Sequence, residues 1–88
     1  MEHASEWTAT VYLEDHDGET RARARLDTGD NAIEGLGTAR RSPRDRDIPE
    51  IGRELATARA LSDLAHKLFE ATVDDIEAST HEAAAITS

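Results

Sequence analysis

The sequence predicts an α+β domain in which a three-stranded antiparallel β-meander is followed by a long helix and a short C-terminal helix. Residues 7–14 and 20–28 alternate with period two, which is typical of half-buried strands. Turn residues separate three strand-like segments. From residue 48 the apolar spacing changes to three and four, as in a helix. The expected order is therefore β-β-β-α-α, in one domain that spans residues 7–81 between flexible segments at 1–6 and 82–88.

The first expected strand is the segment Trp7–Glu14, which is rich in β-branched and aromatic residues. Apolar side chains fall on one face and mainly polar ones on the other. The apolar set is Trp7, Ala9, Val11 and Leu13. The segment Asp15–Gly18 is expected to form the following turn, because Asp and Gly supply side-chain hydrogen bonds and positive φ angles.

The second expected strand, Thr20–Thr28, alternates three arginines with Ala22, Ala24 and Leu26. A helix is the competing interpretation because Ala and Arg favour helices. The strict alternation and the turns on both sides favour a strand. A weaker third strand is expected at Ala32–Arg41, where Gly35 and Gly37 suggest a bulge or a close approach by another backbone.

The strongest helix signal begins after the polar loop at 42–47. Asp47 and Glu50 form a candidate capping box, and Pro49 suits a first turn. The helix is expected to end near Ala71, with Thr72 capping a short second helix that ends near Ser79. Its expected sheet-facing stripe contains Ile48, Ile51, Leu55, Ala58, Leu61, Leu64, Ala65 and Leu68.

The composition predicts a thin hydrophobic core. Leu, Ile, Val and Phe provide 15 of the 88 residues, and the net charge of -9 places the chain near compositions typical of disorder. A monomer of this size buries only about 60–65% of its unfolded surface. Because the periodic patterns nevertheless indicate order, we expect additional core to come from a homodimer.

Basic residues gather between positions 20 and 46. This segment has seven arginines and four acidic residues, whereas the remainder of the chain is strongly acidic. The segregation fits an anion-binding face for RNA phosphates. It also fits a solvated face whose arginines pair with carboxylates, and an acidic dimer would repel nucleic acid at long range. The candidate residues are Arg21, Arg23, Arg25, Arg40, Arg41, Arg44 and Arg46.

Two aromatic residues are candidate contacts for a partner or a second subunit. Trp7 is the largest side chain and could instead lie in the core, while Tyr12 would lie on the arginine side of the sheet. Tyr12 alone offers a base-stacking ring on that face. Sequence recognition of DNA is not expected.

No enzymatic activity, metal or cofactor is expected. The chain has no cysteine, its histidines lack metal-ligand spacing, and no phosphate-binding glycine motif occurs. Ser79, Thr80 and His81 near Asp74 have the residue types of a catalytic triad, but nothing supplies an oxyanion hole. Without an apolar membrane span or a secretory signal, we expect a cytoplasmic protein.

The most specific sequence segments are Asp47–Gly52, Ala58–Leu64, and Asp75–Ala78 together with Thr80–His81. In these segments the chain resembles a small actinobacterial family of unknown function that includes dormancy- and hypoxia-associated mycobacterial proteins. The resemblance runs from about Trp7 to His81. It implies a fold like that of double-stranded-RNA-binding domains and an intertwined homodimer likened to ribosome hibernation-promoting factors.

The expected function is therefore a small, non-enzymatic, stress- or dormancy-associated homodimer that binds ribosomal or other structured RNA. Arginine contacts would position it on phosphates by charge and shape, and binding would act by occlusion. The alternative is a protein-interaction module without a nucleic-acid role, which would use Trp7, Tyr12 and an open sheet face or edge.

Overall fold

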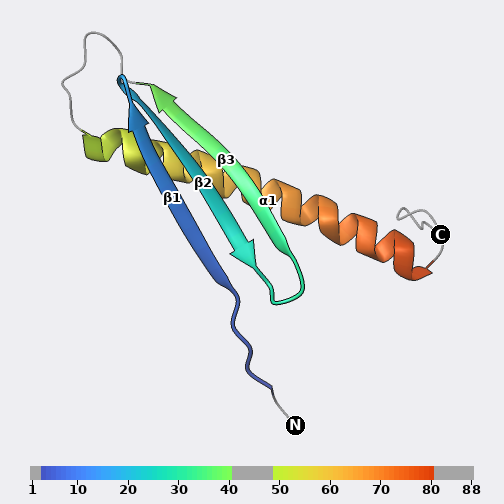
Figure 1. The fold of residues 1–88 in the computed structure, drawn as a ribbon. Helices are drawn as coiled ribbons and strands as arrows, with labels where there is room; N and C mark the ends of the chain where they lie inside the picture. The colour runs from blue at the N-terminus through green and yellow to red at the C-terminus, as the bar shows by residue number, and fades with distance from the viewer. Residues whose placement is uncertain (1–2, 41–48, 81–88) are drawn as a thin grey trace.

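A computed structural model describes residues 3–40 and 49–80, which form three antiparallel strands and one long helix (Figure 1). The strands β1 (Thr8–His16), β2 (Glu19–Asp27) and β3 (Ala32–Arg40) form a sheet in the order β1-β2-β3. The helix α1 (Pro49–Thr80) crosses one face of the sheet and projects past β3. The expected α+β meander is confirmed. Of the segments expected to be flexible, residues 1–2 of the segment 1–6 and all of 82–88 lie outside the described residues.

A tight turn sets the register of the first hairpin. Asp17 and Gly18 have φ angles of 49° and 77°, which fits a two-residue type I′ turn. The strands therefore extend further than expected, and Asp15 pairs with Thr20. Val11 lies opposite Ala24 and Tyr12 opposite Arg23. This register separates a helix-side face from an outer face that carries the β2 arginines, as the alternation predicts.

The backbones of β3 and α1 approach each other directly at two glycines. A Cβ atom on Gly35 would lie 2.3 Å from the carbonyl oxygen of Ala60, and one on Gly37 would lie 2.3 Å from that of Ala56. No other residue type fits at either position without displacing backbone. The expected close approach is confirmed. The pairing of β3 with β2 is uninterrupted, so the alternative of a bulge is not formed.

This close approach builds the core from small side chains and reverses the expected orientation of the helix. Successive turns of α1 present Gly52, Ala56, Ala60 and Leu64 to the sheet, with Gly52 half-buried and the other three buried. The buried apolar residues in the described part of the chain are Ala22, Ala24, Ala39, Ala56, Ala60 and Leu64.

The expected sheet-facing stripe of the helix is therefore wrong except at Leu64. Large side chains do not fit between backbones in contact, so Ile51, Leu55 and Leu61 face solvent. Ala58 and Ala65 are also exposed, Leu68 is half-buried, and Ile48 lies outside the described residues.

Strand β1 contributes less to the core than expected. The helix packs mainly against β3 and β2 and contacts β1 little. On β1, only Val11 is partly buried against the core, beside Leu26 of β2. Ala9 and Leu13 of β1 are exposed. The helix-side face of β1 is thus apolar and largely uncovered.

The short second helix expected after Thr72 is not formed, because α1 continues through this residue to Thr80. The hydroxyl of Thr72 donates a hydrogen bond to the carbonyl oxygen of Leu68, 2.9 Å away, within the same helix. Thr72 therefore bonds back to the preceding turn instead of capping a new one. Neither Gly nor Pro occurs near this position to end the helix.

Three helix side chains occupy the outer edge of β3. The backbone N–H of Leu36 donates to Asp63 Oδ2 at 2.9 Å. Arg59 donates to the carbonyl of Thr38 at 2.8 Å, and Lys67 donates to that of Glu34 at 3.1 Å. Alternate residues of an edge strand point their backbone groups outward, and these contacts satisfy three of them. The β3 edge is thereby protected against pairing with another strand.

We predict that Gly35→Ala destabilises the fold strongly. The new methyl group would meet helix backbone, which cannot move aside as a flexible side chain can. The expected loss is about 3 kcal/mol of unfolding free energy or more, measured by urea denaturation. Gly52→Ala is the control, because its Cβ would lie 3.1 Å from the Thr20 hydroxyl and Ala favours helix by roughly 0.5–1 kcal/mol. Similar losses in both variants would contradict the backbone-contact argument.

We predict that Asp63 makes the fold sensitive to acid. The hydrogen bond from the Leu36 N–H, then that from Lys67, lowers the pKa of the Asp63 carboxyl below its ordinary 3.8. A lowered pKa gives stability that is present above pH 3.8 and is lost as the pH falls through the folded-state value. Urea midpoints at pH 7 and pH 3 should therefore differ more in the unsubstituted protein than in Asp63→Asn. Equal acid losses in the two proteins would refute this role.

Candidate functional site

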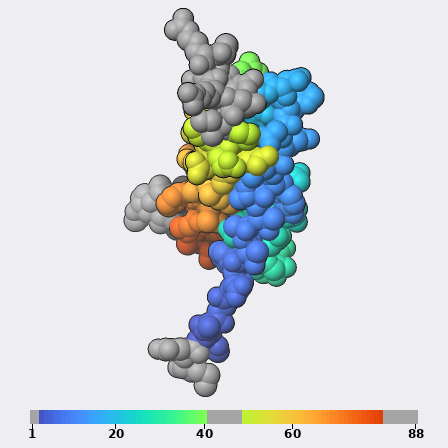
Figure 2. Space-filling view, turned by 90° about the vertical axis from the view of Figure 1, so that its left-hand side faces the viewer, coloured from blue at the N-terminus to red at the C-terminus, as the bar shows by residue number. Residues whose placement is uncertain are grey.

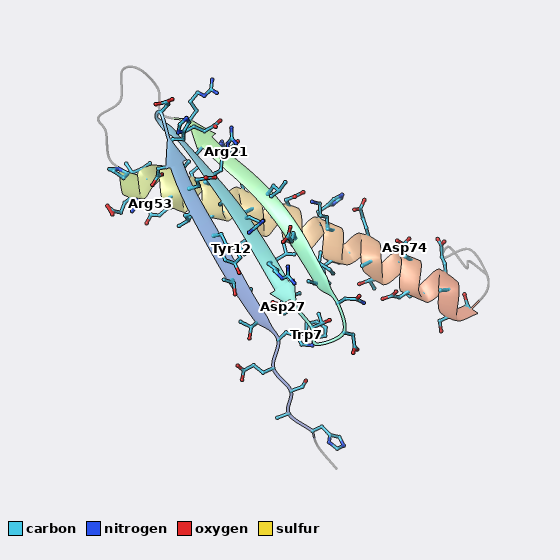
Figure 3. All side chains as sticks on the ribbon, in the orientation of Figure 1. Trp7, Tyr12, Arg21, Asp27, Arg53 and Asp74 are labelled. Atoms are coloured by element: carbon cyan, nitrogen blue, oxygen red, sulfur yellow. The ribbon has the colours of Figure 1, made fainter. Side chains whose placement is uncertain are left out.

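The outer face of the sheet presents four of the predicted arginines. Arg21, Arg23 and Arg25 lie along β2, and Arg40 ends β3 beside them (Figure 3). Their side chains are between 44% and 80% exposed. The other three candidates, Arg41, Arg44 and Arg46, lie outside the described residues. The strand alternation thus gathers the charge of β2 on a face that the helix does not cover.

Every described arginine of this face has an acidic neighbour. Arg21 Nε lies 3.0 Å from Glu19 and Arg40 lies 3.5 Å from the same carboxylate. Arg25 contacts Asp27 at 3.2 Å, and Glu34 lies 3.6 Å from Arg25 and 3.9 Å from Arg23. The alternative of a solvated, paired face therefore fits the geometry as well as an anion site does. Exposed pairs of this kind contribute little stability and are screened by salt.

Glu19 is the acidic centre at one end of the outer face. The hydrogen bond from Arg21 is the main cause that lowers the pKa of its carboxyl, and the charges of Arg21 and Arg40 add to this effect. The carboxylate stays ionised at neutral pH and offsets part of the positive charge. A phosphate group would have to compete with it for the same guanidinium groups.

The two candidate aromatic residues are both at the surface. The guanidinium of Arg23 lies over the ring of Tyr12, 4.8 Å from its centroid, which is a cation–π contact. Trp7 precedes β1 and is 58% exposed, so the interpretation of Trp7 as a core residue is wrong. Figure 3 shows Trp7 near the β2–β3 end of the sheet, well separated from Arg21. A role of either ring in partner binding stays a prediction.

A second surface, which the sequence interpretation missed, consists of exposed large apolar residues on α1 and β1. We call it the apolar surface, and its members are Leu13, Ile51, Leu55, Leu61, Phe69, Val73 and Ile76. Figure 2 views the molecule from the β1 side, where β1 and the helix lie next to each other. A shallow groove between them is lined by Leu13, Arg53, Glu54, Thr57, Ala58 and Leu61.

A sequence signal for this surface does exist. Gly52, Ala56 and Ala60 recur every fourth residue on the helix, and β3 carries Gly35 and Gly37. Small residues on two elements indicate backbones in contact, which leaves no room for larger side chains between them. Recognising this match would have placed the larger apolar residues of the helix on the outside.

A polar cluster fixes the start of the helix beside the groove. Asp15 Oδ2 accepts hydrogen bonds from Arg53 at 2.8 and 3.1 Å, and Asp15 Oδ1 accepts one from Thr20 at 2.6 Å. The Thr20 bond, followed by that from Arg53, lowers the pKa of the Asp15 carboxyl. The hydrogen bond between Arg53 and Asp15 also raises the pKa of the Arg53 guanidinium. This cluster has a positioning role, because it ties α1 to the end of β1.

Among residues 3–40 and 49–80, no group of three or more His, Cys, Asp or Glu side chains is arranged to hold a metal ion. Among the same residues, no helix has the length and apolarity needed to cross a membrane.

Comparisons with known proteins place this architecture in a family. Residues 5–85 match the Rv2632c-like family. An uncharacterized Mycobacterium tuberculosis protein, Rv2632c, is 54% identical over 72 residues, covering 82% of this chain and 77% of the relative. Another, MT1780 from the same species, is 47% identical over 78 residues, covering 89% and 83%.

The crystal structure of Rv2632c has the same fold. It superposes with a TM-score of 0.82 at 49% identity, covering 93% of this chain and 99% of that chain. These matches confirm the resemblance to a mycobacterial family of unknown function. The chain belongs to the Rv2632c-like family.

Proposed function

We propose that this chain is a non-enzymatic, cytoplasmic homodimer that acts as a protein-interaction module. The observation that supports this best is the apolar surface, where seven large apolar side chains are 42–74% exposed. Large apolar patches on small soluble proteins are typical of interaction sites. The outer face supports anion binding less strongly, because its carboxylates offset much of the positive charge of its arginines.

The thin core supports self-association in particular. Among the described residues, the buried apolar side chains are five alanines and Leu64, and no large side chain is fully buried. Burial of apolar area is the main source of folding stability, so this protomer gains little from its interior. A second copy that covers exposed leucine, isoleucine and phenylalanine side chains would supply the missing burial.

We predict a solution mass of twice 9.6 kDa. Light scattering of the purified full chain at several concentrations measures this directly. The dimer should persist on dilution into the micromolar range, because several large apolar side chains leave water when it forms. A mass of one chain at every concentration would overturn the homodimer.

A second candidate function is binding of structured RNA by the outer face, and one specific observation favours it. Four exposed guanidinium groups lie on an uncovered sheet face, with the Tyr12 ring beside them. Arginines of this kind contact phosphates without reading sequence. Occlusion of ribosomal RNA in stress or dormancy is what the resemblance to hibernation-promoting factors implies, and it stays a prediction.

We predict that any RNA binding by this face is steeply salt-dependent. Each phosphate contact releases counterions, and each must also displace a carboxylate from its arginine. Fluorescence anisotropy with a labelled RNA hairpin at 50 and 200 mM salt tests this, and the triple variant Arg21→Ala/Arg23→Ala/Arg25→Ala should weaken binding at least tenfold. Arg53→Ala, a basic residue outside the outer face, is the control. Undiminished binding by the triple variant would exclude the outer face as the RNA site.

A further inference from the structure

Strand β1, blue in Figure 1, forms an open edge of the sheet. The order β1-β2-β3 gives β1 a neighbouring strand on one side only. At the opposite edge, side chains of α1 bind outward backbone groups of β3. Among residues 3–40 and 49–80, no side chain or backbone group bonds to the outward backbone groups of β1. Within this part of the chain, only the β3 edge is closed.

The contacts of β3 show which backbone groups of the sheet point outward. The β3 residues whose backbone groups bond to the helix are Glu34, Leu36 and Thr38. Backbone groups alternate in direction along an antiparallel strand, so the intervening Gly35 and Gly37 bond to β2. On β2, the residues opposite these glycines are engaged with β3. The three β2 arginines between and beside them therefore bond to β1.

The same alternation identifies the outward groups of β1. The β1 partners of the three arginines are Thr10, Tyr12 and Glu14. Because the backbone groups of these partners point toward β2, those of the residues between them point away from the sheet. The outward N–H and C=O groups belong to Ala9, Val11 and Leu13. They recur about every 7 Å along the strand, which is the spacing at which another strand pairs.

Strand β1 lacks the features that usually protect an open edge. Residues 8–13 contain no charged residue, proline or glycine. The strand pairs with β2 at each of its 9 positions, so no bulge turns the edge away from a neighbour. An edge of this kind is a template for pairing with a further strand.

The side chains beside the outward groups indicate which strand would fit. Ala9, Val11 and Leu13 lie on the helix side of the sheet, with Val11 partly buried and the other two exposed. Leu13 also lines the shallow groove against α1. Side chains directly opposite each other on neighbouring strands share a face. Every second side chain of an added strand would therefore contact apolar groups, and apolar side chains fit there best.

The charge at this edge is negative. Residues 1–17 contain five acidic residues and neither lysine nor arginine. Glu14 lies opposite Arg21, but Arg21 bonds to Glu19 instead, at 3.0 Å. Among the residues that the structure describes, no basic side chain pairs with Glu14. Its carboxylate, on the outer face of β1, can therefore pair with a basic side chain on an added strand.

We propose that the β1 edge binds an extended peptide segment of a partner protein as an additional antiparallel strand. The segment has apolar side chains at every second position, on the helix side, and a basic side chain opposite Glu14. Backbone hydrogen bonds to Ala9, Val11 and Leu13 provide affinity, and the alternating side chains provide selectivity. This inference rests on the proposed role as a protein-interaction module, but it does not require that two chains of this protein associate.

Amide hydrogen exchange, followed by NMR on the full chain, tests whether the edge is open and then occupied. In the free protein, the N–H groups of Ala9, Val11 and Leu13 should exchange at least tenfold faster than those of Thr10 and Tyr12, which bond to β2. A bound peptide should slow the three fast amides at least tenfold. Slow exchange of all five in the free protein would show that the edge is already covered, for example by a second copy, and would overturn the inference.

The probe is a labelled, end-blocked peptide with the sequence Lys-Val-Thr-Val-Thr-Val-Lys. In antiparallel pairing its first lysine lies opposite Glu14, and its valines lie opposite Leu13, Val11 and Ala9. Fluorescence anisotropy at increasing concentrations of the full chain measures binding. The same peptide with glutamate in place of both lysines should bind at least fivefold more weakly. The inference would be overturned by an absence of saturable binding up to about 1 mM protein.

Backbone methylation of the peptide separates strand pairing from attraction between side chains. N-methylation of the three valines removes the N–H groups that face β1, and binding should weaken at least tenfold. N-methylation of the two threonines removes N–H groups that face away from β1, and binding should change less than threefold. Equal or reversed effects of the two methylated peptides would contradict the proposed pairing.

Substitutions in the protein test the same edge from the other side. Val11→Pro removes only an outward N–H, a change that edge strands tolerate, and should weaken peptide binding at least tenfold. Urea denaturation checks that this variant is folded. Glu14→Gln should weaken binding about two- to fivefold. Glu77→Gln, the same change near the far end of α1, is the control and should leave binding unchanged. Equal effects of the two glutamate changes would rule out the contact with Glu14.

Light scattering on the same samples distinguishes this inference from the proposed homodimer. A dimer that binds no peptide would overturn the edge site while the homodimer stands. A monomer that binds the peptide, with protection of Ala9, Val11 and Leu13, would overturn the homodimer while the edge site stands.

Discussion

The contact between the backbones of β3 and α1 is the constraint on which the rest of this structure depends. Gly35 and Gly37 place no side chain between the strand and the helix. On the helix, the buried residues at this contact are the small Ala56 and Ala60. Such a contact excludes water efficiently with very little side-chain volume. It therefore accounts for an ordered domain whose buried side chains are nearly all alanine.

The same contact decides what the surface looks like. A helix that sits this close can reach around the sheet edge, so Arg59, Asp63 and Lys67 bond to the outward backbone groups of β3. One edge is thereby closed, while β1 is contacted little by the helix. Large apolar side chains that would ordinarily fill a core are displaced to the outside, where they favour association.

Charge is distributed so that the two candidate surfaces have different characters. The outer face holds arginines and carboxylates in near balance, within 3.0–3.9 Å of one another. Its contacts are exposed and exchangeable, which suits a reversible, salt-sensitive ligand. The apolar surface has charged residues only beside it, such as Arg53 and Glu54 in the groove, and its contribution to binding depends on the apolar area removed from water. For a stable complex of this acidic protein, the apolar surface is therefore the better-suited of the two surfaces.

Periodicity alone determined the elements of this protein. Alternation identified the first two strands and placed Arg21, Arg23 and Arg25 on one face, and the turn residues of Asp15–Gly18 marked the first hairpin. These features depend on neighbours along the chain, which is why a single sequence reveals them. The continuity of α1 past Thr72 is also local, but a hydroxyl that can cap a helix can equally bond to its preceding turn.

Only the tertiary structure decided which side of the helix faces the sheet. Both sides recur at helical spacing, so periodicity alone could not choose between Ala56–Ala60–Leu64 and Ile51–Leu55–Ala58. The choice follows from the distance between helix and strand, which is set by glycines some twenty residues away in sequence. The ion pairs of Glu34 with the β2 arginines also join residues from different elements. So does the hydrogen bond of Asp63 to the β3 edge. A local sequence pattern therefore predicts neither of them.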